Sequence, residues 1–432
     1  MTDFDVAIIG GGPAGAAAAL TLRKRKDIRV ALIERGDYST PKVGESLSPG
    51  TRSLLQYLGL WDRFEAEQTL SLLGSEAAWG SDTLGTMDFI LTLHGAGWAL
   101  DRARFERMMA NAAEDLGTVL MTNTNVAKCR YDGACWRLDL GKDELTARYV
   151  IDAAGRGSFF STRQGGYRQR NDMLTAITAR LPAAANVAQV TRVEAFKDGW
   201  WYAAPLPSGE VIVCLFSDAA RIHRLRLSAP DIWAHHLAET RHISPLVAPE
   251  PCALETLPAF SSLLQGGDPN RPMIAAGDAI AARDPLSSSG IPNAMGSGIQ
   301  AARVAADWLF GAGTLRSAYL DSIARDHSAY LKTHWKTYRT EARWPDAPFW
   351  RFRSAQVTRR PNTMVHLKRG AEGTIFVPGR AAQWIIEAAQ KSVRQIDLVT
   401  GARDAFPDLP DERLILAVED LTDMAEAGEV VL

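Results

Sequence analysis

The sequence predicts an α/β protein with a parallel sheet, a second, mostly antiparallel sheet and a helical C-terminal region. The parallel sheet is indicated by the apolar run 6–9, which enters a glycine-rich turn and then an alanine-rich helix. Segments 148–163 and 271–309 also begin as apolar strands that enter glycine-rich turns. Residues 201–218 have the pattern of two strands joined by a Pro/Gly turn, and the chain beyond about residue 313 has a helical pattern.

Length and composition narrow the possible partners and the compartment. The 432 residues are 46% hydrophobic with a net charge of −2, so the chain can bury a large core but lacks the basic surface that nucleic acids require. Its four cysteines match no metal or redox spacing. The first apolar run follows Asp3 and Asp5 rather than basic residues, and no run is long enough to span a bilayer. We expect a cytoplasmic protein with no metal, nucleic acid or membrane partner.

The first strand, turn and helix form a dinucleotide-binding pattern. Gly10 permits the turn, Gly12 lets the backbone approach a pyrophosphate, and Gly15 lets helix and strand pack closely. Glu34 ends the next strand, where a carboxylate can bind a ribose diol. This pattern alone does not separate FAD from NAD. The predicted cofactor-binding residues in this region are Gly10, Gly12, Pro13, Ala14, Gly15, Glu34 and Arg35.

Further motifs occur in a fixed order: "KVGESLSPG" at 42–50, "WALDRARFERMM" at 98–109, and the two later strand–turn segments. With these, residues 5 to about 310 resemble the FAD-dependent aromatic hydroxylases and flavin-dependent halogenases, which share the GR2, or p-hydroxybenzoate hydroxylase, type of Rossmann-like fold. The resemblance implies FAD as the cofactor. It also implies that FAD contacts Gly44, Glu45, Ser46, Arg102, Gly155, Asp278, Pro285, Ser289, Gly290 and Ile291.

The resemblance implies a discontinuous domain organisation. Residues 1–70, 100–165 and 268–312 would form the FAD-binding domain, and residues 71–99 and 166–267 the substrate-domain sheet that covers the flavin. Residues 313–432 form the helical C-terminal region, either as a packing appendage or as a lid for a large substrate. Within it we expect one helix over residues 379–396.

Three departures separate the chain from the halogenases it resembles. Both chemistries of the family begin with a flavin C4a-hydroperoxide, but halogenases transfer the halogen through a lysine whose position falls near Gly74. No Lys or Arg occurs between Arg63 and Arg102. Ser287 stands where tryptophan halogenases have a catalytic Glu, and the G-W-x-W-x-I-P signature is altered at Tyr202 and Ala204. The resemblance therefore favours an FAD-dependent monooxygenase that hydroxylates an electron-rich aromatic ring.

A subgroup of these flavoproteins also lacks the lysine and carries an added C-terminal segment. The similarity to this subgroup implies that the substrate is a Trp side chain of a partner polypeptide in tryptophylquinone cofactor biogenesis, as in the maturation of quinohemoprotein amine dehydrogenase. The co-substrates would be O2 and electrons from NAD(P)H or a separate flavin reductase. A halogenase of a small aromatic, a prenyl reductase and a non-catalytic flavoprotein scaffold remain alternatives.

The stretch "DGWWYAAPLPSG" at 198–209 is the predicted substrate wall. Strand alternation should place Trp200 and Tyr202 on the face toward the substrate and Trp201 on the opposite face. No acid/base pair stands out from the sequence. Glu45 and His94 are catalytic candidates by their region alone.

Overall fold

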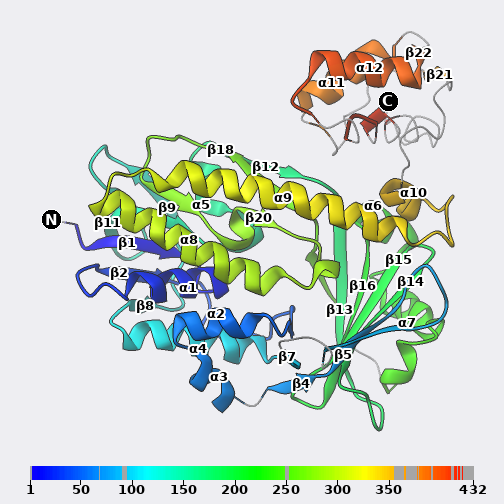
Figure 1. Ribbon diagram of the computed structural model, residues 1–432, viewed down its shortest axis with the longest axis horizontal. Helices are drawn as coiled ribbons and strands as arrows, with labels where there is room; N and C mark the ends of the chain where they lie inside the picture. Colours follow the sequence, from blue (N-terminus) through cyan, green and yellow to red (C-terminus); the bar gives the residue numbers. More distant parts are fainter. Residues whose placement is uncertain are drawn as a thin grey trace.

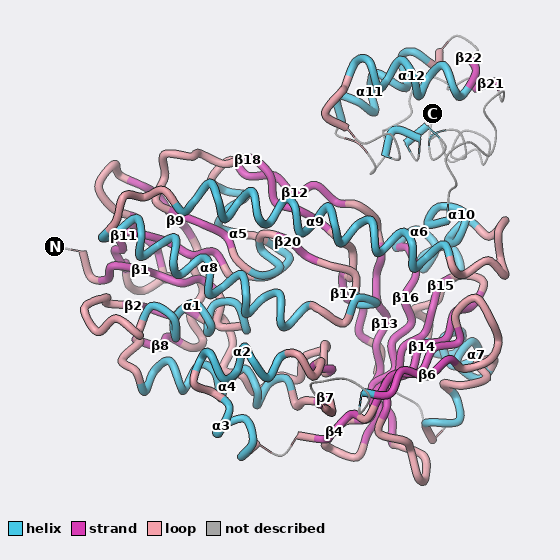
Figure 2. Tube along the Cα trace, viewed as in Figure 1, coloured by secondary structure: helices cyan, strands magenta, loops and turns pink. Residues whose placement is uncertain are grey.

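A computed structural model of the chain shows two sheets lying side by side, with long helices running along the first (Figures 1 and 2). The structure describes residues 2–67, 69–89, 95–248, 253–354, 364–365, 377, 379–390, 393–409, 413–415, 417–418 and 421. Within these ranges, every helix is too short or too polar to cross a lipid bilayer.

The first sheet is parallel at its centre and buried on both faces. Its order is β8 (Val119–Met121), β2 (Val30–Ile33), β1 (Phe4–Ile9), β11 (Glu144–Asp152), β10 (Trp136–Asp139) and β9 (Lys128–Tyr131), and β19 (Met273–Ala275) also pairs with β11. Pairing of β1 with β2, β11 with β1 and β19 with β11 is parallel. The carboxyl ends of β1, β2, β11 and β19 therefore meet at one edge, where a ligand site is expected in such sheets.

Two helices pack closely over this sheet because small residues line their contact. A Cβ added to Gly298 of α8 (Gly290–Phe310) would lie 2.1 Å from the backbone oxygen of Ala14 in α1 (Pro13–Leu22). The alanines of α1 are fully buried in the same core. The other helices near this sheet are α2 (Thr51–Leu58), α3 (Trp61–Ala66), α4 (Arg102–Asp115), α5 (Phe159–Arg163) and α9 (Leu315–Arg339).

The second sheet is mostly antiparallel, as predicted. Its order is β17 (Glu255–Pro258), β13 (Leu174–Pro182), β16 (Glu210–Asp218), β15 (Gly199–Pro205), β14 (Val190–Phe196), β5 (Gly74–Ala78) and β6 (Gly85–Asp88). The strand–turn–strand pattern at 201–218 is confirmed as β15 and β16. One face packs with α6 (Ala219–Leu225) and α7 (Pro230–Ala238), and the other packs with the end of α9 and with α10 (Pro348–Ser354).

Two small sheets join the larger parts. In one, β7 (Gly97–Ala99) pairs with both β3 (Ser46–Leu47) and β4 (Leu70–Leu72). In the other, β18 (Ser262–Gly266) lies between β12 (Gly166–Arg170) and β20 (Ala281–Ala282). These pairings join segments that lie far apart in the sequence.

The C-terminal region is helical, but the single helix expected over residues 379–396 is wrong. Helix α11 (Gly379–Ala388) is followed by β22 (Val393–Arg394), which pairs with β21 (Met364–Val365), and then by α12 (Gln395–Ala405). Strand pairing across the chain overrides the local helical pattern here. These helices share a core of their own around Ile385 and Leu398.

Candidate functional site

The turn between β1 and α1 has the geometry that its glycines predict. Gly10 has φ +105°, and a Cβ there would lie 2.3 Å from the backbone oxygen of Ala153. A Cβ on Gly15 would lie 1.9 Å from the Gly10 oxygen. At Gly12, by contrast, the nearest atom to an added Cβ is 4.0 Å away, on Glu106. The turn is therefore closed against the protein at Gly10 and Gly15 and open at Gly12, where Pro13 starts the helix and leaves backbone N–H groups for a phosphate.

Glu34 follows β2 at the same edge and holds the turn. Its carboxylate accepts hydrogen bonds from the backbone N–H of Gly11 at 2.7 Å and of Gly36 at 3.0 Å. The Tyr38 hydroxyl donates to the Gly11 oxygen at 3.1 Å. Each carboxylate oxygen keeps a free lone pair for a ribose hydroxyl. Arg35 is exposed, so its side chain stands apart from this group.

A cluster of two cations and one carboxylate lies beside the open turn. Glu106 is buried in α4 and pairs with Arg102 and, at 2.5 Å, with Nζ of Lys42. Arg102 Nη1 also donates to the backbone oxygen of Gly44 at 2.8 Å. Arg102 Nε is buried and has no hydrogen-bond partner among the described residues. The cluster can therefore supply positive charge and an unused donor to an anion near Gly12.

The loops after β11 and β19 form the opposite side of the site. Asp278 lies in the turn after β19, and its carboxylate is 3.3 Å from Nε of Arg156, which follows Gly155. Added Cβ atoms on Gly155 and Gly290 would meet nothing within 4 Å, so the backbone is open to a ligand at both positions. Pro285 and Gly290 are exposed, Ser289 directly precedes α8 without a side-chain capping hydrogen bond, and Ile291 is buried in its first turn.

These residues fit FAD. The open turn and the Lys42–Arg102–Glu106 cluster suit the pyrophosphate, Glu34 suits the adenosine ribose, and Asp278 with the backbone at Gly155 suits the ribityl chain. The N-terminus of α8 can stabilise negative charge on a reduced flavin ring. The unpartnered Arg102 Nε is the observation in the structure that favours such an occupant.

A polar group faces the second sheet next to this cofactor site. Glu45 precedes β3 and is 2% exposed, and Oε2 accepts a hydrogen bond from the Gly44 N–H at 2.8 Å. Its Oε1 lies 3.8 Å from Nη2 of Arg180 in β13 and has no hydrogen-bond partner among the described residues. Burial raises the pKa of the Glu45 carboxyl.

Tyr202 and Cys214 complete this group from β15 and β16, where they are register partners. Burial, together with the charge of Glu45, raises the pKa of both the Tyr202 phenol and the Cys214 thiol. Both groups are therefore neutral at ordinary pH. The arrangement can donate protons or hydrogen bonds toward the substrate side, with Ser46 next to the phenol.

The alternation predicted for β15 is confirmed, with one addition. Trp201 lies in the core with Trp233 of α7, while Trp200 and Tyr202 lie on the other face. Trp200, however, is 1% exposed, stacks on Phe216 with 3.9 Å between ring centroids, and is covered by α9 and α10. No local sequence pattern indicates this cover. A direct contact of Trp200 with substrate stays a prediction.

The cover is attached to the loop that precedes α8. Tyr338 of α9 accepts a hydrogen bond from Trp200 Nε1 at 2.9 Å and donates one to Oδ2 of Asp284 at 2.8 Å. Nε2 of His334 lies 3.0 Å from the same oxygen. Asp284 Oδ1 accepts from the Leu286 N–H and so holds the start of the loop. Helix α9 thus positions the loop that leads into α8.

Several residues of the site were not identified from the sequence. Glu106 could have been found, since it lies one helical turn after Arg102. Lys42 and Arg156 lie within the motif segments 42–50 and 148–163 but were not singled out there. Arg180 and Cys214 carry no local signal, because only the pairing of distant segments brings them to the site. His94, a predicted catalytic candidate, lies outside the described residues.

Comparison with known proteins places the chain among flavoproteins. The FAD binding domain family model matches residues 3–228. LodB of Marinomonas mediterranea, whose name describes an FAD-dependent oxidoreductase, is 32% identical over 365 residues, which cover 82% of this chain and 98% of LodB. The flavin-dependent halogenase armH3 of Armillaria mellea is 26% identical over 76% of this chain and 72% of its own length.

Solved structures show the same fold. The flavin-dependent halogenase CmlS superposes with a TM-score of 0.75 at 25% identity, covering 83% of this chain and 69% of CmlS. The peptidyl tryptophan dihydroxylase QhpG, which is essential for tryptophylquinone cofactor biogenesis, superposes with a TM-score of 0.68 at 22% identity. That match covers 86% of this chain and 82% of QhpG.

Proposed function

Because the chain belongs to the FAD binding domain family of flavin-dependent oxidoreductases, we propose that it is an FAD-dependent monooxygenase that hydroxylates an electron-rich aromatic ring. The proposed substrate is a Trp side chain of a partner polypeptide, and the product is a precursor of a tryptophylquinone cofactor. The similarity of fold to QhpG supports this choice of substrate.

The observation that carries the proposal is the environment of Gly74, near which the halogenase lysine is expected. Gly74 lies in β5 and pairs with Asp88 of β6 and with Val190 of β14. A Cβ added to it would lie 2.6 Å from the backbone oxygen of Met87. The strand pairing therefore leaves no space for any side chain at this position, and no other Lys or Arg occurs between Arg63 and Arg102.

Arg180 is a cation near the substrate side, but it does not replace that lysine. Its guanidinium lies 3.8 Å from Glu45 and donates to the backbone oxygen of Lys42 at 3.2 Å. An arginine stays protonated in proteins and offers no nucleophilic lone pair for halogen transfer. Direct transfer of oxygen to a bound ring needs no such group.

When bound, reduced FAD would supply the activation of O2, and the chain's own residues would shape the surroundings of the aromatic ring. Tyr202 and Cys214, both neutral, form a wall that excludes water without adding charge. The Glu45 carboxyl lies at the boundary between that wall and the cofactor site, where its raised pKa suits it to hold or return a proton. The electrons would come from NAD(P)H or from a separate flavin reductase.

The test is oxygen incorporation into a polypeptide. The FAD-loaded protein would be co-expressed with a Trp-containing polypeptide encoded beside its gene, and that polypeptide digested and analysed by mass spectrometry. We expect a Trp-containing fragment to gain the mass of one or two oxygen atoms, with the label retained when 18-O oxygen gas is used. An unchanged fragment in the presence of reduced FAD and oxygen would sink the peptidyl-Trp proposal.

Halogenation is the second candidate, and the similarity to CmlS and armH3 favours it. The same protein would be incubated with reduced FAD, oxygen, bromide and either free tryptophan or a phenol. A product with the bromine isotope pattern would establish a halogenase and replace the monooxygenase proposal. Consumption of oxygen without brominated product agrees with the monooxygenase.

A further inference from the structure

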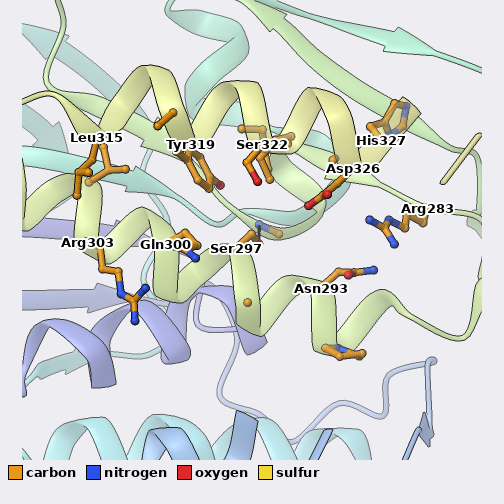
Figure 3. Close-up of a pocket in the computed structure, with 18 residues that line it drawn as sticks. Arg283, Asn293, Ser297, Gln300, Arg303, Leu315, Tyr319, Ser322, Asp326 and His327 are labelled. Atoms are coloured by element: carbon orange, nitrogen blue, oxygen red, sulfur yellow. Dashed lines mark hydrogen bonds between the residues drawn. The ribbon is translucent and has the colours of Figure 1, made fainter. Parts of the chain in front are cut away.

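A cleft of about 410 Å³ lies between α8 and α9, on the flank of α8 away from its contact with α1 (Figure 3). Its floor is formed by the segment Gly277–Ala281, which continues from the Asp278 turn. The backbone N–H of Gly277 donates to Ser297 Oγ at 2.8 Å, so the wall of this cleft adjoins the loop assigned to the cofactor. None of the functions proposed above uses the cleft.

One end of the cleft is apolar, and the other carries polar groups that the protein leaves unused. Leu315, Ala318, Tyr319 and Ile323 of α9 line the apolar side of the first end, opposite Gln300 and Arg303 of α8 (Figure 3). Arg283, Asn293, Asp326 and His327 line the polar end (Figure 3). Such a division suits a ligand with an apolar body and a polar head.

Three hydrogen-bond donors at the polar end lack acceptors. Asn293 Nδ2 is buried with no partner among the described residues. His327 is 4% exposed, and its Nε2 faces the amide nitrogen of Asn171 at 2.8 Å, which puts the imidazole proton on Nδ1. That Nδ1 is also buried and unpartnered within the described chain. Leaving buried donors unpaired costs free energy, which a ligand acceptor would recover.

The third donor is the Arg283 guanidinium, which stacks at 5.2 Å on the ring of Tyr330. It makes no hydrogen bond or ion pair with any described side chain, and Asp326 likewise has no such partner in the described ranges. Burial lowers the pKa of the Arg283 guanidinium and the nearby Asp326 carboxylate acts in the opposite direction, yet the two side chains form no ion pair. The cleft therefore presents a separated cation and anion with free donors around the cation.

We propose that this cleft binds an α-amino acid with an apolar side chain. The carboxylate meets Arg283, Asn293 and the His327 N–H, the ammonium meets Asp326, and the side chain enters the apolar end toward Ile323. A zwitterion satisfies both charges at once, whereas a simple carboxylate would leave Asp326 close to its own negative charge. The site is independent of the proposed monooxygenase chemistry.

The test is isothermal titration calorimetry of the full-length FAD-loaded protein with three probes of one shape: L-phenylalanine, 3-phenylpropanoate and 2-phenylethylamine. We expect phenylalanine to bind and the other two to bind at least about tenfold more weakly, because each lacks one charged contact. Equal binding of phenylalanine and 3-phenylpropanoate, or no binding of phenylalanine, would overturn the proposal.

Variants of the residues that line the cleft test whether phenylalanine binds there. Arg283→Gln and Asp326→Asn should each weaken phenylalanine binding about tenfold or more. Arg303→Gln is the matched control: Arg303 also lines the cleft, but its side chain points away from α9 and donates to the Tyr57 hydroxyl at 3.0 Å. Ala318→Phe, at an exposed position of α9, should block the apolar end without touching a charge. Unchanged binding in Ala318→Phe would place phenylalanine elsewhere and reject the site.

Discussion

Glu45 is a buried carboxyl whose raised pKa makes stability depend on pH. Burial favours the neutral form, so the cost of ionising the folded protein is absent below the pKa of the unfolded chain. Stability is therefore lost as the pH rises from that value through the folded pKa, by about 1.4 kcal/mol for each pH unit that separates the folded pKa from the unfolded one. The isosteric change Glu45→Gln should leave stability unchanged near pH 4 and raise it at pH 8.

Denaturant unfolding of the FAD-free protein at several pH values measures this effect. The two proteins should converge at low pH, which serves as the internal control. A constant difference across the whole range would mean that Glu45 is ionised throughout and that its interaction with Arg180 outweighs its burial.

Substitutions on the two faces of β15 should affect different properties. One face should affect the coupling of oxygen consumption to product formation, and the other the stability of the fold. Trp201 is fully buried against Trp233, so Trp201→Ala should destabilise the protein by about 3–5 kcal/mol. Tyr202→Phe removes only the hydroxyl beside Ser46, so it should change stability little but raise hydrogen peroxide release per oxygen consumed. Thermal unfolding and peroxide assays distinguish the two effects. The reverse pattern would show that Tyr202 is structural and does not line the substrate side.

At the scale of elements, the pairing of β5 with β6 determines what residue 74 can be. Gly74→Lys should destabilise the protein by about 1–3 kcal/mol, because the new Cβ meets the Met87 backbone. It should not produce brominated product, since the strand must shift before the ammonium can reach the substrate. The matched variant is Ser75→Lys, at a partly exposed neighbour in the same strand, which should be tolerated. Bromination by Gly74→Lys would contradict the proposed distinction from halogenases.

The attachment of α9 to the loop before α8 is also testable. Burial opposes the charge of Asp284, but His334 and Tyr338 overcome it and lower the pKa of the carboxyl. A lowered pKa gives stability above the ordinary carboxyl pKa, and this stability is lost as the pH falls toward the folded pKa. Tyr338→Phe leaves Trp200 Nε1 without an acceptor and removes one of the hydrogen bonds to Asp284 Oδ2, which keeps His334, and should cost about 1–3 kcal/mol at pH 7.

A double-mutant cycle tests whether the hydrogen bonds that join Trp200, Tyr338 and Asp284 cause this loss of stability. In Trp200→Phe the Tyr338 hydroxyl still donates to Asp284, so adding Tyr338→Phe should cost less than it does in the wild type, because one orphaned donor is already gone. Additive effects, measured by denaturant unfolding, would mean that the two residues stabilise the fold independently and that the hydrogen-bonded path is unimportant.

Elements differ in how far the sequence predicts them. Gly10, Gly12, Gly15 and Glu34 lie within one β–α–β stretch, so the cofactor half of the site follows from local pattern. The meeting of Glu45 with Arg180 does not, because it depends on the register of β13 in a sheet assembled from distant segments. The same reason explains the wrong helix at 379–396, where pairing with Met364–Val365 decides the structure.

At the scale of the whole molecule, the chain contains a boundary between two hydrophobic cores that composition did not reveal. Trp350 and Phe349 of α10 are fully buried against the second sheet, and Arg353 pairs with Asp218 of β16. The described residues between Val377 and Leu421 instead form a separate core. The first segment belongs to the body that holds the site, and the second has its own hydrophobic interior.

Two truncations should therefore behave differently. A chain ending at Ser354 keeps α10 in place and should bind FAD and unfold near the midpoint of the flavin-binding body of the full protein, although it loses the contact of Arg413 with Gln169. A chain ending at Ala347 exposes the faces that Phe349 and Trp350 cover and should aggregate or unfold at a much lower temperature, because burying these two rings contributes several kcal/mol. Flavin fluorescence and calorimetry measure both. Failure of the longer truncation to bind FAD would show that residues beyond 354 are part of the same cooperative unit.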